Sequence, residues 1–258
     1  MQVLSFGAGV QSVTIMEMIF AKELPRPGVV IFADTQNEPQ SVYDAVSRAS
    51  SRCDAIGLPF FSVTKGDLGA WKRNRSVHVP LFTVDQTTGE RGQLFRTCTD
   101  RFKIDAVKAK CSALGMGHRK EGAEMIIGFS LDEISRVGGG QKLPKWITRK
   151  FPLLELEMRR SDCQAYLRRA GVTAGKSACT FCPFRTHEGW MLMKRRDPPA
   201  FEEAQAYDES IRDCRPGFKS YVHQHCIALS KVPMPPPSLF DAEEFVDSCE
   251  TGFCEMFP

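Results

Sequence analysis

The sequence has no long apolar run. No stretch approaches the roughly 18 consecutive apolar residues that indicate a membrane-spanning helix. An apolar segment begins within two residues of the N-terminus, which leaves no room for the charged and apolar regions of a signal peptide. We therefore expect a cytoplasmic protein with no membrane segment, in a compartment where thiols stay reduced.

The sequence also has little net charge. A formal charge of +3 over 258 residues is too small to indicate nucleic-acid binding by itself. Its distribution is more informative, because residues 142–176 carry nine Lys and Arg against three Asp and Glu, whereas residues 241–258 carry six acids and no base. This pattern favours an anionic partner at the middle of the chain; a solvated basic face is the alternative.

Two common nucleotide-binding motifs are absent from the N-terminal segment. Residues 3–12 form an apolar strand followed by two glycines, and they lead into a predicted helix. No Gly-Lys-Ser/Thr follows the glycines, which excludes a Walker loop, and Ser12 stands where a Rossmann motif has its third glycine. The segment still predicts an anion cradle, because the N–H groups of a first helical turn are free and lie at the positive end of the helix dipole. Tight packing of the helix on a sheet is the alternative.

The next segments alternate between strand and helix patterns. Residues 28–34 are a continuous apolar run, residues 40–56 have one apolar helical face, and residues 58–63 give a third strand. This order predicts a parallel sheet with right-handed connections. Asp34 follows the second strand directly, at the edge where such sheets bind ligands, so it is either a helix N-cap or a ligand of magnesium or ribose.

The middle of the chain predicts further elements around polar side chains. Residues 66–95 have no periodic pattern and predict a substrate-facing lid. Residues 100–114 predict a helix, which puts Cys98 at an N-terminus where the dipole favours thiolate. Residues 124–130 predict another strand. The residues after it, Asp132, Glu133 and Arg136, are either magnesium and phosphate ligands or a helix cap with its salt bridges.

The last third predicts an edge strand at residues 146–153, helices at 187–196 and 199–213, and an irregular segment at 216–237. The acidic tail carries Cys249 and Cys254, which either reach into an active site or belong to a free end.

The chain has ten cysteines, many for a protein without structural disulfides. Cys179 and Cys182 have the spacing of a metal-binding pair, and the proline after the second is typical of iron–sulfur ligation. Together with Cys98 and Cys163 they supply four thiols, the number that a four-iron cluster or a tetrahedral zinc ion requires. A zinc knuckle or a redox-active thiol pair are the alternatives.

Five segments, in this order, resemble the PAPS-reductase-like group of PP-loop ATP pyrophosphatases, in the adenine nucleotide α-hydrolase-like superfamily. They are residues 5–12, 32–35, 96–104, 128–133 and 176–184. The resemblance covers most of residues 3–213. It departs from the usual Ser-Gly-Gly-x-Asp-Ser loop at Gln11, which replaces the Asp.

The resemblance implies a five-stranded parallel, doubly wound sheet in residues 1–158 and a helical, cysteine-rich extension in residues 159–258. Implied nucleotide-binding residues are Ser5, Phe6, Gly7, Ala8, Gly9, Gln11, Ser12, Asp34, Thr35 and Gly128. Implied catalytic residues are Ser12, Asp34, Asp132 and Arg136. Implied metal ligands are Cys98, Cys163, Cys179 and Cys182, for a 4Fe–4S cluster or, less readily, zinc.

The implied activity is cleavage of ATP, with Mg²⁺, between its α and β phosphates. The AMP group would activate an acceptor for sulfur incorporation, either DNA, as phosphorothioate, or tRNA. A sulfur-donor protein such as a cysteine desulfurase would be a partner. The alternatives are an adenylyl-sulfate or phosphoadenylyl-sulfate reductase that uses a tail cysteine, and a non-enzymatic nucleic-acid-binding protein with a zinc knuckle.

Overall fold

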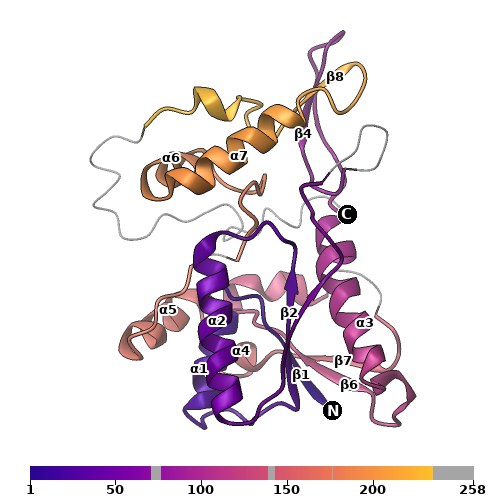
Figure 1. The fold of residues 1–258 in the computed structure, drawn as a ribbon, viewed down its shortest axis with the longest axis vertical. Helices are drawn as coiled ribbons and strands as arrows, with labels where there is room; N and C mark the ends of the chain where they lie inside the picture. The colour runs from indigo at the N-terminus through magenta and orange to yellow at the C-terminus, as the bar shows by residue number, and fades with distance from the viewer. Residues whose placement is uncertain (71–76, 139–142, 176, 235–258) are drawn as a thin grey trace. The chain divides into compact units, whose positions relative to one another are not determined.

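The structure is a computed structural model that describes residues 1–70, 77–138, 143–175 and 177–234 (Figure 1). The chain forms two compact units. The first contains Met1–Gly66 and Thr99–Ser177, and the second contains Asp67–Cys98 and the chain from Ala178 onward. This division differs from the boundary predicted at residue 158, because residues 67–98 join the later, cysteine-bearing part of the chain. Within the described residues, no helix combines the length and apolar character needed to cross a membrane.

The first unit confirms the predicted α/β fold. Its five strands are all parallel and lie in the order β3-β2-β1-β6-β7. The strands are β1 (Gln2–Ser5), β2 (Val29–Asp34), β3 (Phe60–Thr64), β6 (Ala123–Ile126) and β7 (Ile147–Lys150). The helices are α1 (Val10–Phe20), α2 (Gln40–Ala55), α3 (Asp105–Ala113), α4 (Pro152–Glu155) and α5 (Arg160–Arg169). A π-helical turn at Thr99–Ile104 precedes α3, and 3₁₀ turns occupy Met116–His118 and Leu131–Val137.

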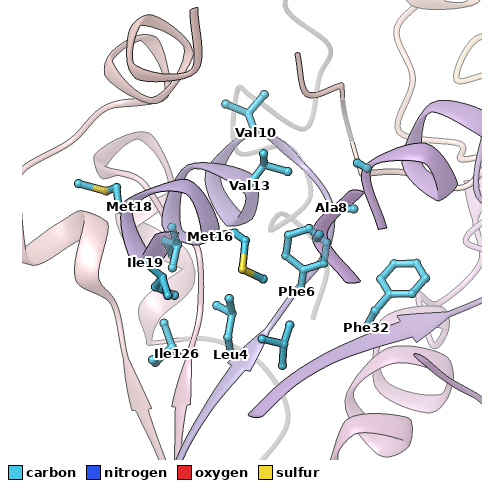
Figure 2. Packing of buried hydrophobic residues seen from close by; sticks show 14 of the residues in the cluster. Leu4, Phe6, Ala8, Val10, Val13, Met16, Met18, Ile19, Phe32 and Ile126 are labelled. Atoms are coloured by element: carbon cyan, nitrogen blue, oxygen red, sulfur yellow. The ribbon is translucent and has the colours of Figure 1, made fainter. Parts of the chain in front are cut away.

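Successive residues of the strands pack on opposite faces of this sheet. Leu4 and Phe32 face a core shared with α1, α2 and α5, whereas Val3 and Ile31 face a second core shared with α3 (Figures 1 and 2). Side chains of a strand alternate between the two faces, so a strand covered on both sides must be apolar throughout. This explains the continuous apolar run of β2, and it leaves the ends of the strands as the place for polar chemistry.

The second unit contains strands that the sequence pattern did not predict. An antiparallel sheet in the order β5-β4-β8 joins β4 (Phe82–Asp85), β5 (Arg91–Gln93) and β8 (Phe218–Tyr221). The predictions of irregular chain at residues 66–95 and 216–237 are therefore wrong at these strands. The helices α6 (His187–Arg196) and α7 (Pro198–Ser210) confirm the two predicted helices, and a 3₁₀ turn follows at Leu229–Lys231.

A buried aspartate joins the later parts of the second unit. Asp208, on α7, is fully buried and accepts hydrogen bonds from the backbone N–H groups of Val222, at 2.9 Å, and Leu229, at 3.1 Å. Its carboxylate also pairs with Arg212. One side chain thus satisfies backbone donors in two segments that have no regular partner there.

Candidate active site

The sheet of the first unit has a topological switch point at β1. The chain runs from β1 to β2 and β3 on one side, and it later adds β6 and β7 on the other side. Open α/β sheets bind ligands outside the carboxyl ends of the strands at such a point. The segments that follow β1 and β6 therefore flank the expected ligand position, and both carry predicted site residues.

The segment after β1 turns sharply into α1. Ala8 adopts the left-handed conformation, with φ of 58°, and Gly9 is the N-cap of α1 but offers no side chain to the first-turn N–H groups. The first helical hydrogen bond runs from Val13 N to Gly9 O, at 2.9 Å. The N–H groups of the first turn of α1 thus have no side-chain cap and lie at the positive end of the helix dipole, which is an anion-binding arrangement. The geometry of residues 5–12 therefore suits a phosphate group.

The glycines of this region allow close approach of other backbone. A Cβ atom on Gly9 would lie 2.9 Å from Cβ of Ser177. A Cβ atom on Gly128 would lie 3.0 Å from the backbone nitrogen of Ser12 and 3.2 Å from the carbonyl carbon of Gln11. Close packing thus explains these two glycines. The left-handed backbone conformation in this segment is adopted by Ala8. At Gly128, the segment after β6 packs directly against the start of α1.

Gln11, in the first turn of α1, lies beside a carboxylate. The side chain is 8% exposed, and its amide nitrogen donates to Oε2 of Glu133 at 2.9 Å. Its amide oxygen accepts from Nη1 of Arg160 at 3.3 Å. The negative charge next to the loop is therefore carried by Glu133, which also pairs with Arg136.

The carboxylate of Asp132 accepts hydrogen bonds from neighbouring protein groups. Its Oδ2 accepts from the backbone nitrogen of Arg160 at 2.6 Å and from the hydroxyl of Ser130 at 3.3 Å, and its Oδ1 lies 3.8 Å from Nη1 of Arg159. Together with the Glu133–Arg136 pair, this is the arrangement of caps and salt bridges that the sequence left open as an alternative. Catalytic roles for Asp132 and Arg136 stay predictions.

Polar residues after β2 form a second hydrogen-bonded group. Oδ1 of Asp34 accepts from Gln36 N at 2.7 Å and from the hydroxyl of Tyr43 at 3.0 Å. Burial, followed by the hydrogen bond to Asp34 and its charge, raises the pKa of Tyr43 to about 12, so the phenol stays protonated and donates. The side chain of Thr35 is buried and donates to Oε1 of Glu38 at 3.1 Å.

The same oxygen of Glu38 lies 3.0 Å from Nζ of Lys103, in the π-helical turn before α3. The sequence pattern alone does not mark either residue of this pair as a site residue. A signal was present: Glu38 belongs to the polar cluster after the second strand, and Lys103 belongs to one of the five resembling segments. Only the fold shows that the two meet.

The four predicted thiol ligands are divided between the two units. Cys163 is fully buried among the apolar residues between α1 and α5, in the first unit, and burial raises the pKa of its thiol to about 11. The other three, Cys98, Cys179 and Cys182, belong to the second unit. In the part of the chain that the structure describes, no three His, Cys, Asp or Glu side chains converge as metal ligands.

A buried tyrosine lies near three thiols of the second unit. Burial, then the charges of Cys179, Cys214 and Cys98, raise the pKa of Tyr207, whose ring stacks on Phe181 at 3.7 Å. Among the described residues, its buried hydroxyl has no hydrogen-bond partner. An orphaned donor beside thiols suits a sulfur ligand, but the thiols do not form a ready cluster site, so no reaction step is assigned to a cluster. Cys249 and Cys254 lie outside the described residues.

Three histidines of the second unit form a hydrogen-bonded chain. The backbone nitrogen of His225 donates to Nδ1 of His223 at 3.1 Å, and Nε2 of His223 lies 2.9 Å from Nδ1 of His187. Because Nδ1 of His223 accepts, its proton resides on Nε2 and His187 is the acceptor. Burial, then the charges of His187 and His225, lower the pKa of His223 to about 4, so the buried imidazole is neutral.

No model of a known protein family matches the sequence, and no curated protein matches it. Among solved structures, the chain is similar to the U34-tRNA thiolase NcsA from Methanococcus maripaludis with its 4Fe–4S cluster. The two are 12% identical, the match covers 82% of this chain and 72% of that chain, and the TM-score is 0.39. A similarity this distant supports no conclusion about the chemistry of this chain.

Proposed function

We propose that this protein is a PP-loop ATP pyrophosphatase that transfers AMP to an acceptor, which is then attacked by sulfur. The observation that carries the proposal is the turn at residues 5–12 into the uncapped start of α1, because it lies at the switch point of a parallel sheet and packs against the segment after β6 at Gly128. That combination supports a phosphate chain as the ligand.

In this proposal the backbone does most of the phosphate binding. The N–H groups from Gly9 to Ser12 and the positive end of the α1 dipole stabilise the negative charge that moves onto the leaving pyrophosphate. Ser12 donates its hydroxyl proton to Gly9 O at 3.2 Å, which holds the first turn in shape. Asp34 is the proposed magnesium ligand, and Mg²⁺ would neutralise the phosphate oxygens during transfer.

Sulfur chemistry and a nucleic-acid acceptor form the finer part of the proposal. The basic residues at 142–176 would bind the phosphate backbone of tRNA or DNA. One of the thiols Cys98, Cys179 and Cys182 would attack the outer sulfur of a persulfide on a donor protein such as a cysteine desulfurase, so that the donor leaves as a thiol and this chain carries the persulfide. An iron–sulfur cluster or a zinc ion at these thiols would need a further ligand.

The test is the identity of the products of ATP. Incubation of the protein with Mg²⁺ and ATP labelled at the α-phosphate, with and without tRNA or DNA, should release pyrophosphate and yield AMP or an AMP adduct. Ser12→Ala should slow this release, whereas Ser112→Ala, on the exposed surface of α3, should not. Release of ADP and phosphate, or no turnover of ATP with any acceptor, would overturn the proposal.

A further inference from the structure

Glu38 is a buried carboxylate with one oxygen satisfied and one open. The residue lies between β2 and α2, and its side chain is 1% exposed. Oε1 accepts from Thr35 Oγ1 at 3.1 Å and pairs with Lys103 Nζ at 3.0 Å. Oε2 is equally buried and has no hydrogen-bond partner among the residues that the structure describes.

The open oxygen requires a particular kind of partner. A buried acceptor left without a donor costs about 1–3 kcal/mol, so native proteins rarely keep one unless a ligand or water completes it. The negative charge of Glu38 is already balanced by Lys103. The missing partner is therefore a neutral N–H or O–H donor, and a second cation is not needed.

The position of Glu38 indicates where that donor comes from. β2 pairs in parallel with β1, with Ile31 opposite Ser5, so the segment after β2 and the turn after β1 leave the sheet at the same edge. In doubly wound nucleotide-binding folds, an acid near the end of the second strand accepts a hydrogen bond from the ribose. Two acids lie at this position here: Asp34 is the last residue of β2, and Glu38 follows it.

Asp34 fits that role less well than Glu38. Its Oδ1 already accepts from both Gln36 N and the hydroxyl of Tyr43. Those two bonds belong to the turn that connects β2 to α2, in which Gln36 adopts the left-handed conformation, with φ of 62°. Glu38 is likewise fixed at one oxygen by two donors, but its other oxygen is buried without a protein partner, whereas Asp34 is only half-buried, so water can reach it.

We propose that Oε2 of Glu38 accepts a hydrogen bond from the nucleoside part of a bound adenine nucleotide, through a ribose hydroxyl or the exocyclic amine. The inference rests on the proposed function, since it takes residues 5–12 to bind the phosphates of the same molecule. It assigns nucleoside recognition to Glu38, and it leaves Asp34 to the turn and to the magnesium ion.

The first experiment uses the unmutated protein and four nucleotides. Dissociation constants for ATP, 2′-deoxy-ATP, 3′-deoxy-ATP and purine riboside triphosphate are measured by calorimetry. The analogue that lacks the donor to Glu38 should bind about 10- to 100-fold more weakly than ATP, the range for a hydrogen bond to a charged group. The remaining analogues should bind within about twofold of ATP, which identifies the hydroxyl or the amine.

The second experiment repeats the titrations with Glu38→Gln. The amide oxygen still accepts from Thr35 and Lys103, and the amide N–H₂ replaces the open oxygen. Discrimination between ATP and the critical analogue should collapse to about twofold. ATP itself should weaken more if the partner is the amine, which only donates, than if it is a hydroxyl, which also accepts. Glu202→Gln, on the exposed face of α7, is the matched control and should leave all four constants unchanged.

The outcomes separate this inference from the proposed function. Equal affinity of the unmutated protein for all four nucleotides would overturn the role of Glu38, even if AMP and pyrophosphate are still released. Unchanged discrimination in Glu38→Gln would also overturn it. If the unmutated protein binds no ATP at all, both the inference and the proposed function fall.

Discussion

Gly128→Ala should weaken both the fold and nucleotide binding. The added Cβ would lie 3.0 Å from Ser12 N and 3.2 Å from both the carbonyl carbon and Cβ of Gln11. Two of these three atoms are backbone and cannot rotate away, so the first turn of α1 must shift. Overpacking of this kind costs about 1–3 kcal/mol. For a chain of this size, such a loss lowers the melting temperature by about 2–10 °C.

The same shift should displace the N–H groups that bind phosphate, and an affinity loss of about tenfold corresponds to only about 1.4 kcal/mol. Thermal unfolding followed by circular dichroism, together with ATP titration, measures both effects. Gly138→Ala is the control, because an added Cβ there meets nothing within 4 Å and φ is −83°. Equal melting temperatures and equal ATP affinities for the two variants would refute the reasoning.

Three further predictions concern the buried polar groups and thiols. Asp208→Asn should lower the free energy of unfolding by about 2–3 kcal/mol in urea titrations, because it removes the buried charge that pairs with the half-buried Arg212 and accepts from Val222 and Leu229; a loss below about 1 kcal/mol would contradict this. His223 has its ordinary pKa of 6.5 in the unfolded chain and a pKa of about 4 in the folded chain. The free energy of unfolding should therefore fall by up to about 3 kcal/mol as the pH falls through this window. His223→Gln should flatten this dependence of the free energy of unfolding on pH. Cys163→Ala should lower stability by about 1–2 kcal/mol and leave the iron or zinc content of the purified protein unchanged, whereas loss of metal would restore Cys163 to the ligand set.

Much of the sheet unit could be predicted from the sequence, because its strands are apolar on both faces and follow one another closely along the chain. β2 is an example. Its residues before Asp34 are all apolar, which is typical of a strand in the middle of a sheet that is covered on both faces. The second unit could not be predicted in the same way. β5 consists of Arg91, Gly92 and Gln93, a polar triplet with no strand pattern, and it becomes a strand only through its pairing with β4.

The location of the candidate site could be predicted, but its contacts could not. The turn at residues 5–12 and the polar residues at the end of β2 follow from local patterns. The pairing of Glu38 with Lys103 joins residues that are far apart in the sequence, and the contact of Gln11 with Glu133 depends on the meeting of two strand ends. The thiols show the same limit. The sequence predicts Cys163 as a metal ligand and gives no role to Cys214, whereas in the structure the charge of Cys214 acts on Tyr207.

The order of synthesis along the chain limits when the second unit can fold. β4 is the middle strand of its sheet, and its partner β8 is encoded after the whole of the remaining first unit, with Thr83 opposite Ser220. One edge of β4 therefore stays unpaired during synthesis until nearly all of the chain has emerged from the ribosome. Truncations that end before β8 should consequently yield an aggregation-prone product rather than a smaller folded protein, and expression of the protein should depend on chaperones that hold β4 in that interval.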